Sequence, residues 1–526
     1  MRDGSSGFVI EADAGASQSL LTADAVTLGT GSSLVLDGYG PARRVRRLWL
    51  DTFDWRLYRA GLTLEQQASG ASTELVLTDR DGERLASLPV PGGRGPALTW
   101  PRLVSALPPG PLRELLEPVA GIRALAPVAR AASRIRERRV LNSDTKTVAR
   151  LEIDEMSVSL PARATALPRV SVTPLRGYQA QADRISAVLA ATAGIMPSMR
   201  SGLEAALAGA GRQPAWRSPP VQLAAGMPAA TAVAAILRAQ LDAAEANVPG
   251  TIRDIDTEFL HDLRIAIRRT RSVLKLAGSA LPGGLAASYR PEFRWIGDLT
   301  TPTRDLDVYL LGFDDMAASL VGAPAADLEP FREYLTRARA AAHRDLARGL
   351  RSARFARLVT GWRAELTAVR SARKRPTAAQ LAAGRIAVAQ RRALRAGHRI
   401  TPASPATDLH ELRKDCKELR YLVELFGSLH DPTQRWHLIR ELKALQDCLG
   451  EFQDAEVQRT ELHAFADRML AERRAPAATL LAMGEVAAGL ARRQAAARID
   501  FDGKFAAFAS KANQARLAAL TQAGGI

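Results

Sequence analysis

A pattern of one histidine and three basic residues occurs twice in this chain, 149 residues apart. The two copies are His261, Arg264, Arg268 and Arg271, and then His410, Arg413, Lys417 and Arg420. The same offset holds further along, where the segment 304–308 (RDLDV) is matched by 453–457 (QDAEV). A register that is kept without a gap indicates that a structural unit has been duplicated.

The spacing of the pattern predicts one face of a helix. Positions i, i+3, i+7 and i+10 lie within about 80° of one another on an α-helix. Their side chains therefore form a stripe about 15 Å long. Apolar residues occupy the opposite face, for example Leu263 and Ile267 in the first copy and Leu412 and Leu419 in the second. Stacked like charges destabilise a helix unless an anion neutralises them, so the stripe favours an anion site.

The predicted anion-binding residues include both stripes and their immediate neighbours. Lys275 prolongs the first stripe, whereas Glu424 occupies that place in the second, and Arg269 and Lys414 lie near the stripe edges. The full set is His261, Arg264, Arg268, Arg269, Arg271, Lys275, His410, Arg413, Lys414, Lys417 and Arg420, with Arg392 and Arg395 as second-tier contacts. We predict no catalytic residue, no metal ligand and no cofactor.

The charge of the chain supports a polyanionic partner. Basic residues number 72 and acidic residues 55, which gives a net charge of +17. Residues 1–210 contribute +4 to this excess and residues 211–526 contribute +13. The duplicated region thus carries most of the surplus charge, and nucleic acid, an anionic membrane or another polyanion would be attracted to it.

Two kinds of pattern divide the chain. Up to about residue 175, short segments of alternating apolar residues are separated by turn signals such as Arg80-Asp81-Gly82 and Asn142-Ser143-Asp144, which predicts antiparallel strands. Residues 179–210 are predicted to be helical. After a proline-rich linker the chain reads as helical to its end, and its repeat predicts paired bundles with pseudo-two-fold symmetry. The predicted domains are 1–210, a linker 211–228, and a helical domain 229–515 with halves at about 229–370 and 378–515.

Several local expectations accompany this α+β multidomain assignment. We expect helix breaks near Pro282, Pro302, Pro324, Pro376 and 402–405. Cys416 and Cys448 lack a paired spacing and are expected to be free, buried thiols. No secretory leader or apolar run of about 18 residues is recognised, so we expect a cytoplasmic protein without a membrane segment.

The segments HDLRIAIRRTR (261–271), HELRKDCKELRY (410–421) and LKALQDCLGEFQDAEV (442–457) resemble the CHAD family, the conserved histidine α-helical domain. The resemblance covers roughly residues 228–515. It implies two four-helix bundles with internal symmetry that bind inorganic polyphosphate in a basic central groove. It also implies a candidate location on polyphosphate granules.

The first part of the chain resembles the CYTH family, the triphosphate tunnel fold, at LDTFDWRLYRAGLTL (50–64) and ARLEIDE (149–155). The resemblance implies an antiparallel β tunnel. Active members carry an ExExK strand near the N-terminus, whereas residues 8–37 of this chain contain a single glutamate, Glu11. We therefore expect a degenerate domain without catalysis.

Two alternative functions stay open on the sequence. A basic groove would also attract nucleic acid through phosphate contacts, although aromatic residues for base stacking are missing from the stripes except for Tyr421. A residual metal-dependent triphosphatase could use Glu152 and Asp154. The acidic residues Asp305, Asp307, Asp454 and Glu456 are expected either to cap a helix or to pair with stripe arginines.

Overall fold

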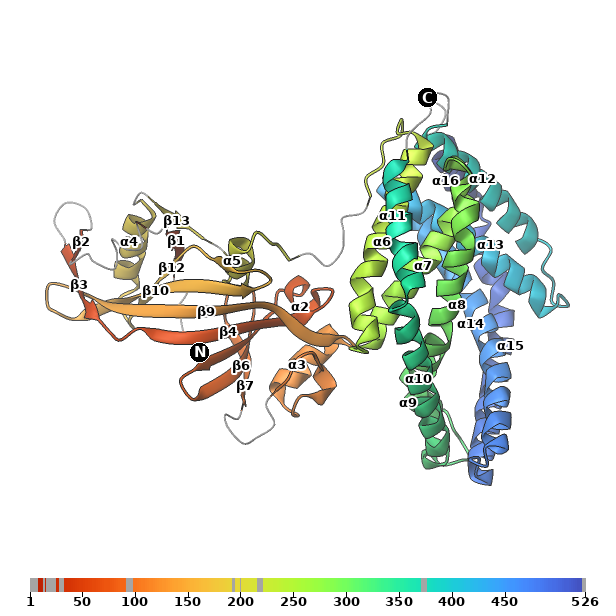
Figure 1. Ribbon diagram of the computed structural model, residues 1–526, viewed down its shortest axis with the longest axis horizontal. Coiled ribbons are helices and arrows are strands. Elements are labelled where there is room, and N and C mark those ends of the chain that lie inside the picture. Colours follow the sequence, from red (N-terminus) through yellow and green to blue (C-terminus); the bar gives the residue numbers. More distant parts are fainter. Residues whose placement is uncertain are drawn as a thin grey trace. The chain divides into compact units, whose positions relative to one another are not determined.

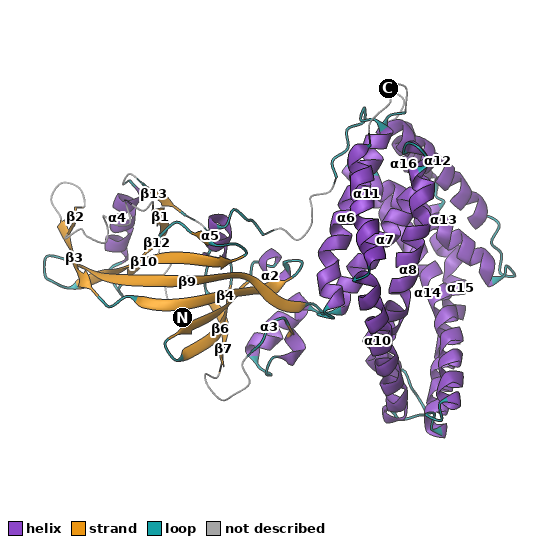
Figure 2. Ribbon diagram, viewed as in Figure 1, coloured by secondary structure: helices purple, strands orange, loops and turns teal. Residues whose placement is uncertain are grey.

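The structure of the chain, a computed structural model, falls into two compact units, Met1–Arg217 and Ser218–Ile526. It describes residues 8–12, 15, 25–27, 33–90, 98–191, 194–198, 200–214, 221–369 and 376–522. The first unit is an antiparallel sheet with short helices, and the second is built of helices (Figures 1 and 2). This confirms the predicted fold class. The predicted linker over 211–228 lies partly outside the described residues.

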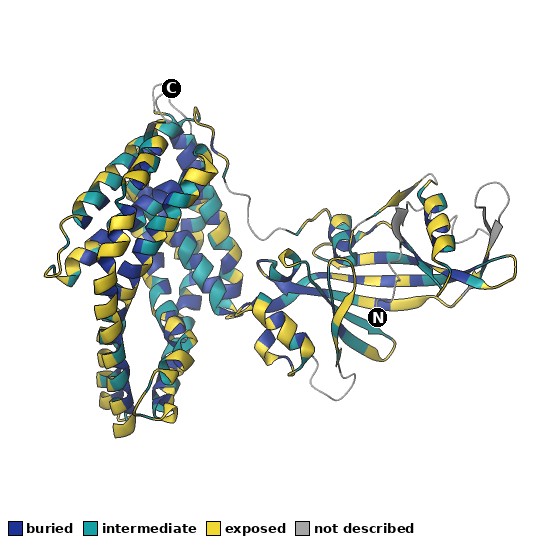
Figure 3. Ribbon diagram, turned by 180° about the vertical axis from the view of Figure 1, so that it is seen from behind, coloured by how far each residue is buried: buried dark blue, intermediate teal, exposed yellow. Residues whose placement is uncertain are grey.

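The strands of the first unit form one antiparallel sheet. Their bounds are β1 Phe8–Ala12, β2 Ala25–Thr27, β3 Ser33–Tyr39, β4 Arg43–Thr52, β5 Thr63–Ser69, β6 Ser72–Thr78, β7 Arg84–Val90, β8 Arg102–Leu103, β9 Ala124–Leu141, β10 Thr147–Leu160, β11 Ala164–Thr165, β12 Arg169–Pro174 and β13 Ile195–Pro197. The main path is β13-β1-β12-β10-β9-β4-β5-β6-β7. The long hairpin of β9 and β10 is central, and buried and exposed positions alternate along it (Figure 3).

Turn chemistry places the two predicted hairpins. Gly82 has a φ of +84° between β6 and β7, a conformation that glycine adopts without a steric penalty. Between β9 and β10, the Asn142 side chain accepts hydrogen bonds from the backbone N–H groups of Asp144 and Lys146, at 3.1 and 2.9 Å. Both hairpin predictions are therefore confirmed.

Among the described residues, four short helices complete the first unit. Their bounds are α2 Arg56–Arg59, α3 Pro111–Ala120, α4 Gln179–Ala190 and α5 Gly202–Gly209. The helical prediction over 179–210 is right for α4 and α5, but β13 lies between them and pairs with β1. The helical pattern of α4 was extended past residue 190 in the prediction, so this short strand at the edge of the sheet was not predicted.

The second unit consists of helices in two sets. Their bounds are α6 Ala229–Ile252, α7 Thr257–Leu276, α8 Leu285–Leu311, α9 Phe313–Ala318, α10 Glu329–Leu350, α11 Ala353–Ala368, α12 Ala378–Gly397, α13 Ala406–Leu425, α14 Pro432–Ala471, α15 Ala477–Phe508 and α16 Lys511–Gln522. Tyr309 of α8 donates a hydrogen bond to the backbone oxygen of Gln458 of α14, at 3.2 Å. These two residues are 149 positions apart, so a residue meets its own counterpart where the repeats touch. Such a contact is expected at an axis of two-fold pseudo-symmetry.

One predicted helix break is wrong. Helix α8 continues through Pro302, which is exposed. Proline in a helix removes one backbone hydrogen bond, but buried residues lie on both sides of it, among them Ile296, Thr300, Thr303 and Leu306. Packing of this continuous buried face offsets the loss of the bond. The break predicted near Pro376 adjoins residues 370–375, which lie outside the described residues.

The largest core cluster joins both helical sets. Trp362 is fully buried in it and packs edge-on against Phe293, with ring centroids 5.5 Å apart. Cys416 and Cys448 are free and buried, as predicted. In the parts of the chain that the structure describes, every helix is too short or too polar to cross a membrane.

Two glycines provide a test of this packing. A Cβ atom on Gly250 of α6 would overlap the ring of Phe259, whereas one on Gly384 of α12 would meet nothing within 4 Å. Gly250→Ala should therefore lower the free energy of unfolding by ~1–3 kcal/mol through overpacking. Gly384→Ala should raise it by ~0.5–1 kcal/mol, because alanine is the better helix former. Chemical denaturation measures both, and a stabilised Gly250→Ala variant would contradict the packing.

Candidate anion-binding site

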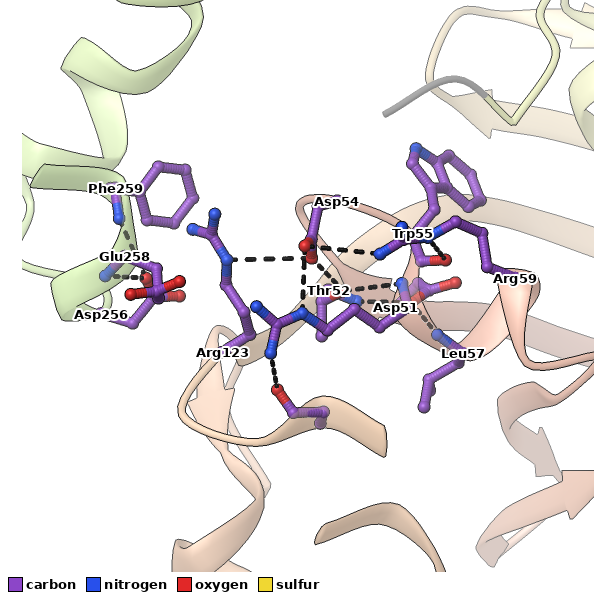
Figure 4. A network of polar contacts seen from close by, with 12 residues as sticks. Asp51, Thr52, Asp54, Trp55, Leu57, Arg59, Arg123, Asp256, Glu258 and Phe259 are labelled. Atoms are coloured by element: carbon purple, nitrogen blue, oxygen red, sulfur yellow. Dashed lines mark hydrogen bonds and ion pairs between the residues drawn. The ribbon is translucent and has the colours of Figure 1, made fainter. Parts of the chain in front are cut away.

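Two equivalent helices, α7 and α13, carry the predicted stripes. Helix α7 begins after Asp256, whose carboxylate accepts hydrogen bonds from the backbone N–H groups of Glu258 and Phe259, at 3.0 and 3.2 Å (Figure 4). This cap satisfies free backbone donors and fixes the start of the helix. The apolar face of each helix is buried, as Leu263 of α7 and Leu412 of α13 illustrate. Burial of one face leaves the basic stripe on the other.

Ion pairs cross between the two helices in a reciprocal pattern. Lys275 of α7 pairs with Glu418 of α13, and Arg269 of α7 lies 3.8 Å from Glu424 of α13 (Nη2 to Oε2). Arg269 and Glu418 occupy equivalent positions of the repeat, and so do Lys275 and Glu424. Each position therefore contacts the counterpart of the other, as in an isologous two-fold interface. The first copy supplies both cations, and the second supplies both carboxylates.

Beside these ion pairs, cations from both helices gather around Lys417. The pKa of Lys417 is lowered to about 8, first by burial and then by the positive charges of Arg413, Arg268 and Arg420. Arg268 belongs to α7 and the others to α13, so the two stripes meet here. Within the described residues, no hydrogen bond or ion pair engages the side chains of Arg268, Arg271 or Lys417. These three groups are available to an anion.

Other predicted site residues are held by partners inside the protein. Arg264 donates hydrogen bonds to the hydroxyl oxygens of Thr300 and Thr301 of α8, at 3.0 and 2.8 Å. Arg413 pairs with Asp454 at 3.1 Å, and Arg420 lies 3.4 Å from Glu424. Lys414 pairs with Glu411 one turn earlier. These contacts fix the positions of the Arg264, Arg413, Lys414 and Arg420 side chains.

The two histidines lie near equivalent residues that differ in charge, Gln453 for His410 and Arg304 for His261. His410 lies within hydrogen-bonding distance of Gln453, at 2.9 Å between Nδ1 and Oε1. The counterpart of Gln453 is Arg304. Burial and then the charge of Arg304 lower the pKa of His261. Both effects favour the neutral form of the His261 imidazole.

The four acidic residues that were expected to cap helices or to pair with arginines lie inside α8 (Asp305 and Asp307) and α14 (Asp454 and Glu456). The prediction that they cap helices is therefore wrong. Pairing with a stripe arginine is found for Asp454, which holds Arg413. The buried Asp307 lies instead 2.7 Å from Arg339 of α10, which belongs to neither stripe.

The second-tier residues lie on α12 and differ from each other. Arg392 pairs with Asp415 at 2.6 Å and also with Glu418, so it is engaged in the interior ion-pair cluster. Arg395 donates a hydrogen bond to the backbone oxygen of Arg391, at 3.2 Å on its own helix. Arg392 is thus a structural partner of Glu418, and Arg395 is exposed beside it.

A pocket of about 1300 Å³ opens beside the α7 stripe. It brings together Arg268, Arg271, Ser272, Leu274, Lys275, Ala287, Arg290, Pro291, Arg294, Trp295, Asp298, Leu299 and Lys414. Arg290 and Arg294 of α8 were not predicted. The counterpart of Arg294 is Lys443, which was a usable signal, whereas the counterpart of Arg290 is Ile439, so the repeat gives no signal for Arg290.

The polar residues of the first unit are largely paired. Arg47 lies between two carboxylates, 2.8 Å from Glu65 and 3.1 Å from Asp154. Burial raises the pKa of Glu65, and the charge of Arg47 opposes that rise. Asp154 is therefore held by an arginine rather than left open to a cation. In the described portion of the chain, no cluster of three or more His, Cys, Asp or Glu side chains is placed to hold a metal.

The segment that carries the CYTH resemblance forms a structural network. Asp54 accepts hydrogen bonds from Thr52 and Arg56, at 2.7 and 3.0 Å, and lies 3.8 Å from Arg123 (Figure 4). Asp51 accepts from the backbone N–H groups that begin α2. These contacts hold the turn between β4 and α2.

The clustered cations lie in an all-α unit beside a pocket lined by basic residues. A family model described as the CHAD domain matches residues 235–463, so the helical unit carries a CHAD domain, as the histidine motifs predicted. The crystal structure of the CHAD domain from the plant Ricinus communis is similar at 24% identity and a TM-score of 0.48, over 56% of this chain and 97% of that one. PptA from Streptomyces chartreusis is similar at 19% identity and a TM-score of 0.43, over 53% and 99% of the respective chains. No curated protein matches the chain.

The crossed ion pairs predict unequal effects on stability. Glu418 is 9% exposed and serves both Lys275 and Arg392, so Glu418→Ala should lower the free energy of unfolding by ~2 kcal/mol, because Lys275 loses its partner and Arg392 keeps only Asp415. Glu424→Ala, at the more exposed and longer contact, should cost less than ~1 kcal/mol. Urea denaturation of both variants is the measurement. Equal losses of unfolding free energy would contradict the larger contribution of Glu418 to stability.

Proposed function

We propose that the helical unit binds inorganic polyphosphate along the facing stripes of α7 and α13, without cleaving it. The observation that carries the proposal is a group of cations from both repeats, Arg268, Arg271 and Lys417, whose side chains form no hydrogen bond or ion pair within the described residues. The CHAD domain is linked to polyphosphate binding as a family, which supports this choice of polyanion. Association with polyphosphate granules is part of the same proposal.

The chemistry of the groove suits a repeating phosphate chain. Arginine forks can donate two hydrogen bonds to the non-bridging oxygens of one phosphate, whereas lysine acts as a point charge. Arg264, Arg413 and Arg420 are held in place by their internal partners and would line the path. An anion at the centre would compensate the mutual repulsion around Lys417 and keep its amine protonated to higher pH.

Nucleic acid fits the same groove less well. Single-stranded nucleic acid is commonly held by aromatic side chains that stack on the bases. Tyr421, the aromatic residue of the second stripe, is 7% exposed and packs into the helical unit. Stacking is thus not offered along the stripes, and phosphate contacts alone are left. A triphosphatase reaction in the first unit is not favoured, because Arg47 occupies the carboxylates of Glu65 and Asp154.

Charge reversal tests the site directly. Arg268→Glu with Arg271→Glu should weaken binding of long-chain polyphosphate at least tenfold, because two unpaired cations become repulsive. The matched control is Arg344→Glu with Arg348→Glu, an equal charge change on exposed positions of α10. Calorimetric titration at several salt concentrations measures both. Equal weakening by the control would show that only net charge matters and would overturn the proposal.

The low pKa of Lys417 gives a pH signature. The free protein loses this proton above about pH 8, whereas a bound anion raises the lysine pKa and retains the proton. Affinity should therefore fall as the pH rises above about 8, by at most about tenfold per pH unit. Lys417→Arg should remove this part of the dependence, since a guanidinium stays charged. The same decline in the arginine variant would contradict a role for Lys417 in binding.

A further inference from the structure

The pocket between α7 and α8 has chemistry that a polyphosphate chain would not use. Its lining includes the apolar residues Leu274, Pro291, Trp295 and Leu299, here called the floor, and several basic side chains, here called the rim. Inorganic polyphosphate has no apolar part to cover such a floor. Sites for small organic ligands, in contrast, combine an apolar lining with a few placed polar groups.

The rim of the pocket is strongly cationic. Arg271 of α7 and Arg290 and Arg294 of α8 line it. Arg290 also donates a hydrogen bond to the backbone oxygen of Leu274, at 2.8 Å, which fixes it beside the floor. In the residues that the structure describes, the side chains of Arg271 and Arg294 form no hydrogen bond or ion pair. Three guanidinium groups around one opening suit a short run of phosphates.

One acidic residue, Asp298, stands among these cations. It lies one turn after Arg294 on α8 and lines the same pocket, yet no ion pair or hydrogen bond to its carboxylate is found among the described residues. A carboxylate repels phosphate but accepts hydrogen bonds from hydroxyl and amine groups. Asp298 is exposed at the pocket, so it can accept hydrogen bonds from a ligand that carries donors as well as phosphates.

Trp295 is held in a defined orientation at the floor. The guanidinium of Arg354 lies 4.2 Å from its ring centroid, and Arg354 is in turn paired with Glu292 at 2.9 Å. The ring is only partly buried, and it packs against the core of the helical unit. A fixed, partly exposed indole is a suitable surface for a planar base.

We infer that this pocket binds a nucleoside triphosphate. Its phosphates would contact Arg271, Arg290 and Arg294, its ribose or amine donors Asp298, and its base the floor at Trp295. The volume of about 1300 Å³ accommodates such a ligand. The inference rests in part on the proposed polyphosphate site, because the pocket shares Arg268, Arg271, Lys275 and Lys414 with it, and it adds the apolar floor and Asp298.

The test compares ATP with inorganic tripolyphosphate on the full chain by calorimetry, at equal ionic strength and without divalent metal. ATP should bind at least tenfold more tightly, because tripolyphosphate offers similar charge but neither base nor donors. Arg290→Glu with Arg294→Glu should weaken both ligands at least tenfold. Equal or tighter binding of tripolyphosphate would overturn the inference.

Two variants separate the base from the phosphates. Trp295→Ala should weaken ATP at least fivefold while changing tripolyphosphate less than twofold, and Asp298→Asn should weaken ATP about threefold without affecting the fold. Parallel losses for both ligands would show that the floor does not contact a base. Tighter binding to phosphoinositide vesicles than to ATP would assign the pocket to a lipid headgroup and would also overturn the inference. Long-chain polyphosphate binding, measured on the same variants, reports separately on the α7–α13 groove.

Discussion

The helical unit depends on ion pairs between α7 and α13 whose charges differ from those of an exact two-fold arrangement. With exact symmetry, both copies would carry the same residue, and so the same charge, at each of the two positions. Here the pairs Lys275–Glu418 and Arg269–Glu424 are possible because the repeat lies on one chain and its copies have diverged. The first copy is cationic at both positions, and the second is anionic. Two helices with like-charged stripes can then lie side by side.

The same divergence distributes the free cations unevenly. In the second copy, Arg413, Lys414 and Arg420 are each paired with a carboxylate. In the first copy, Arg268 and Arg271 lack such partners within the described residues, and Arg294 of the adjacent α8 does as well. The cations of the second copy are therefore mostly paired inside the protein, whereas the first copy offers most of the unpaired charge. The neighbouring pocket lies on the half with unpaired charge.

The sequence predicts the fold and the general nature of the site, but not its internal partners. Helical periodicity and turn residues suffice for the two fold classes and for both hairpins, because these signals are local. The continuity of α8 through Pro302 and the engagement of Arg392 by Glu418 depend on packing between helices, which no local pattern contains. The repeat comparison identified the stripes because both copies keep them. It missed Arg290, since the other copy has an isoleucine there.

Lys417 links the stability of the unit to its ligand. Burial and three nearby arginines disfavour its charged form, so these cations repel one another at neutral pH. Asp454 offsets part of this repulsion, whereas the carboxylates Glu418 and Glu424 are engaged by Lys275, Arg392, Arg269 and Arg420. An anion beside Lys417 would relieve the remaining repulsion, and binding to the folded state alone stabilises a protein by mass action. The cluster therefore lowers the stability of the free unit and increases the gain on binding, which is the balance expected where a basic site is kept for an external polyanion.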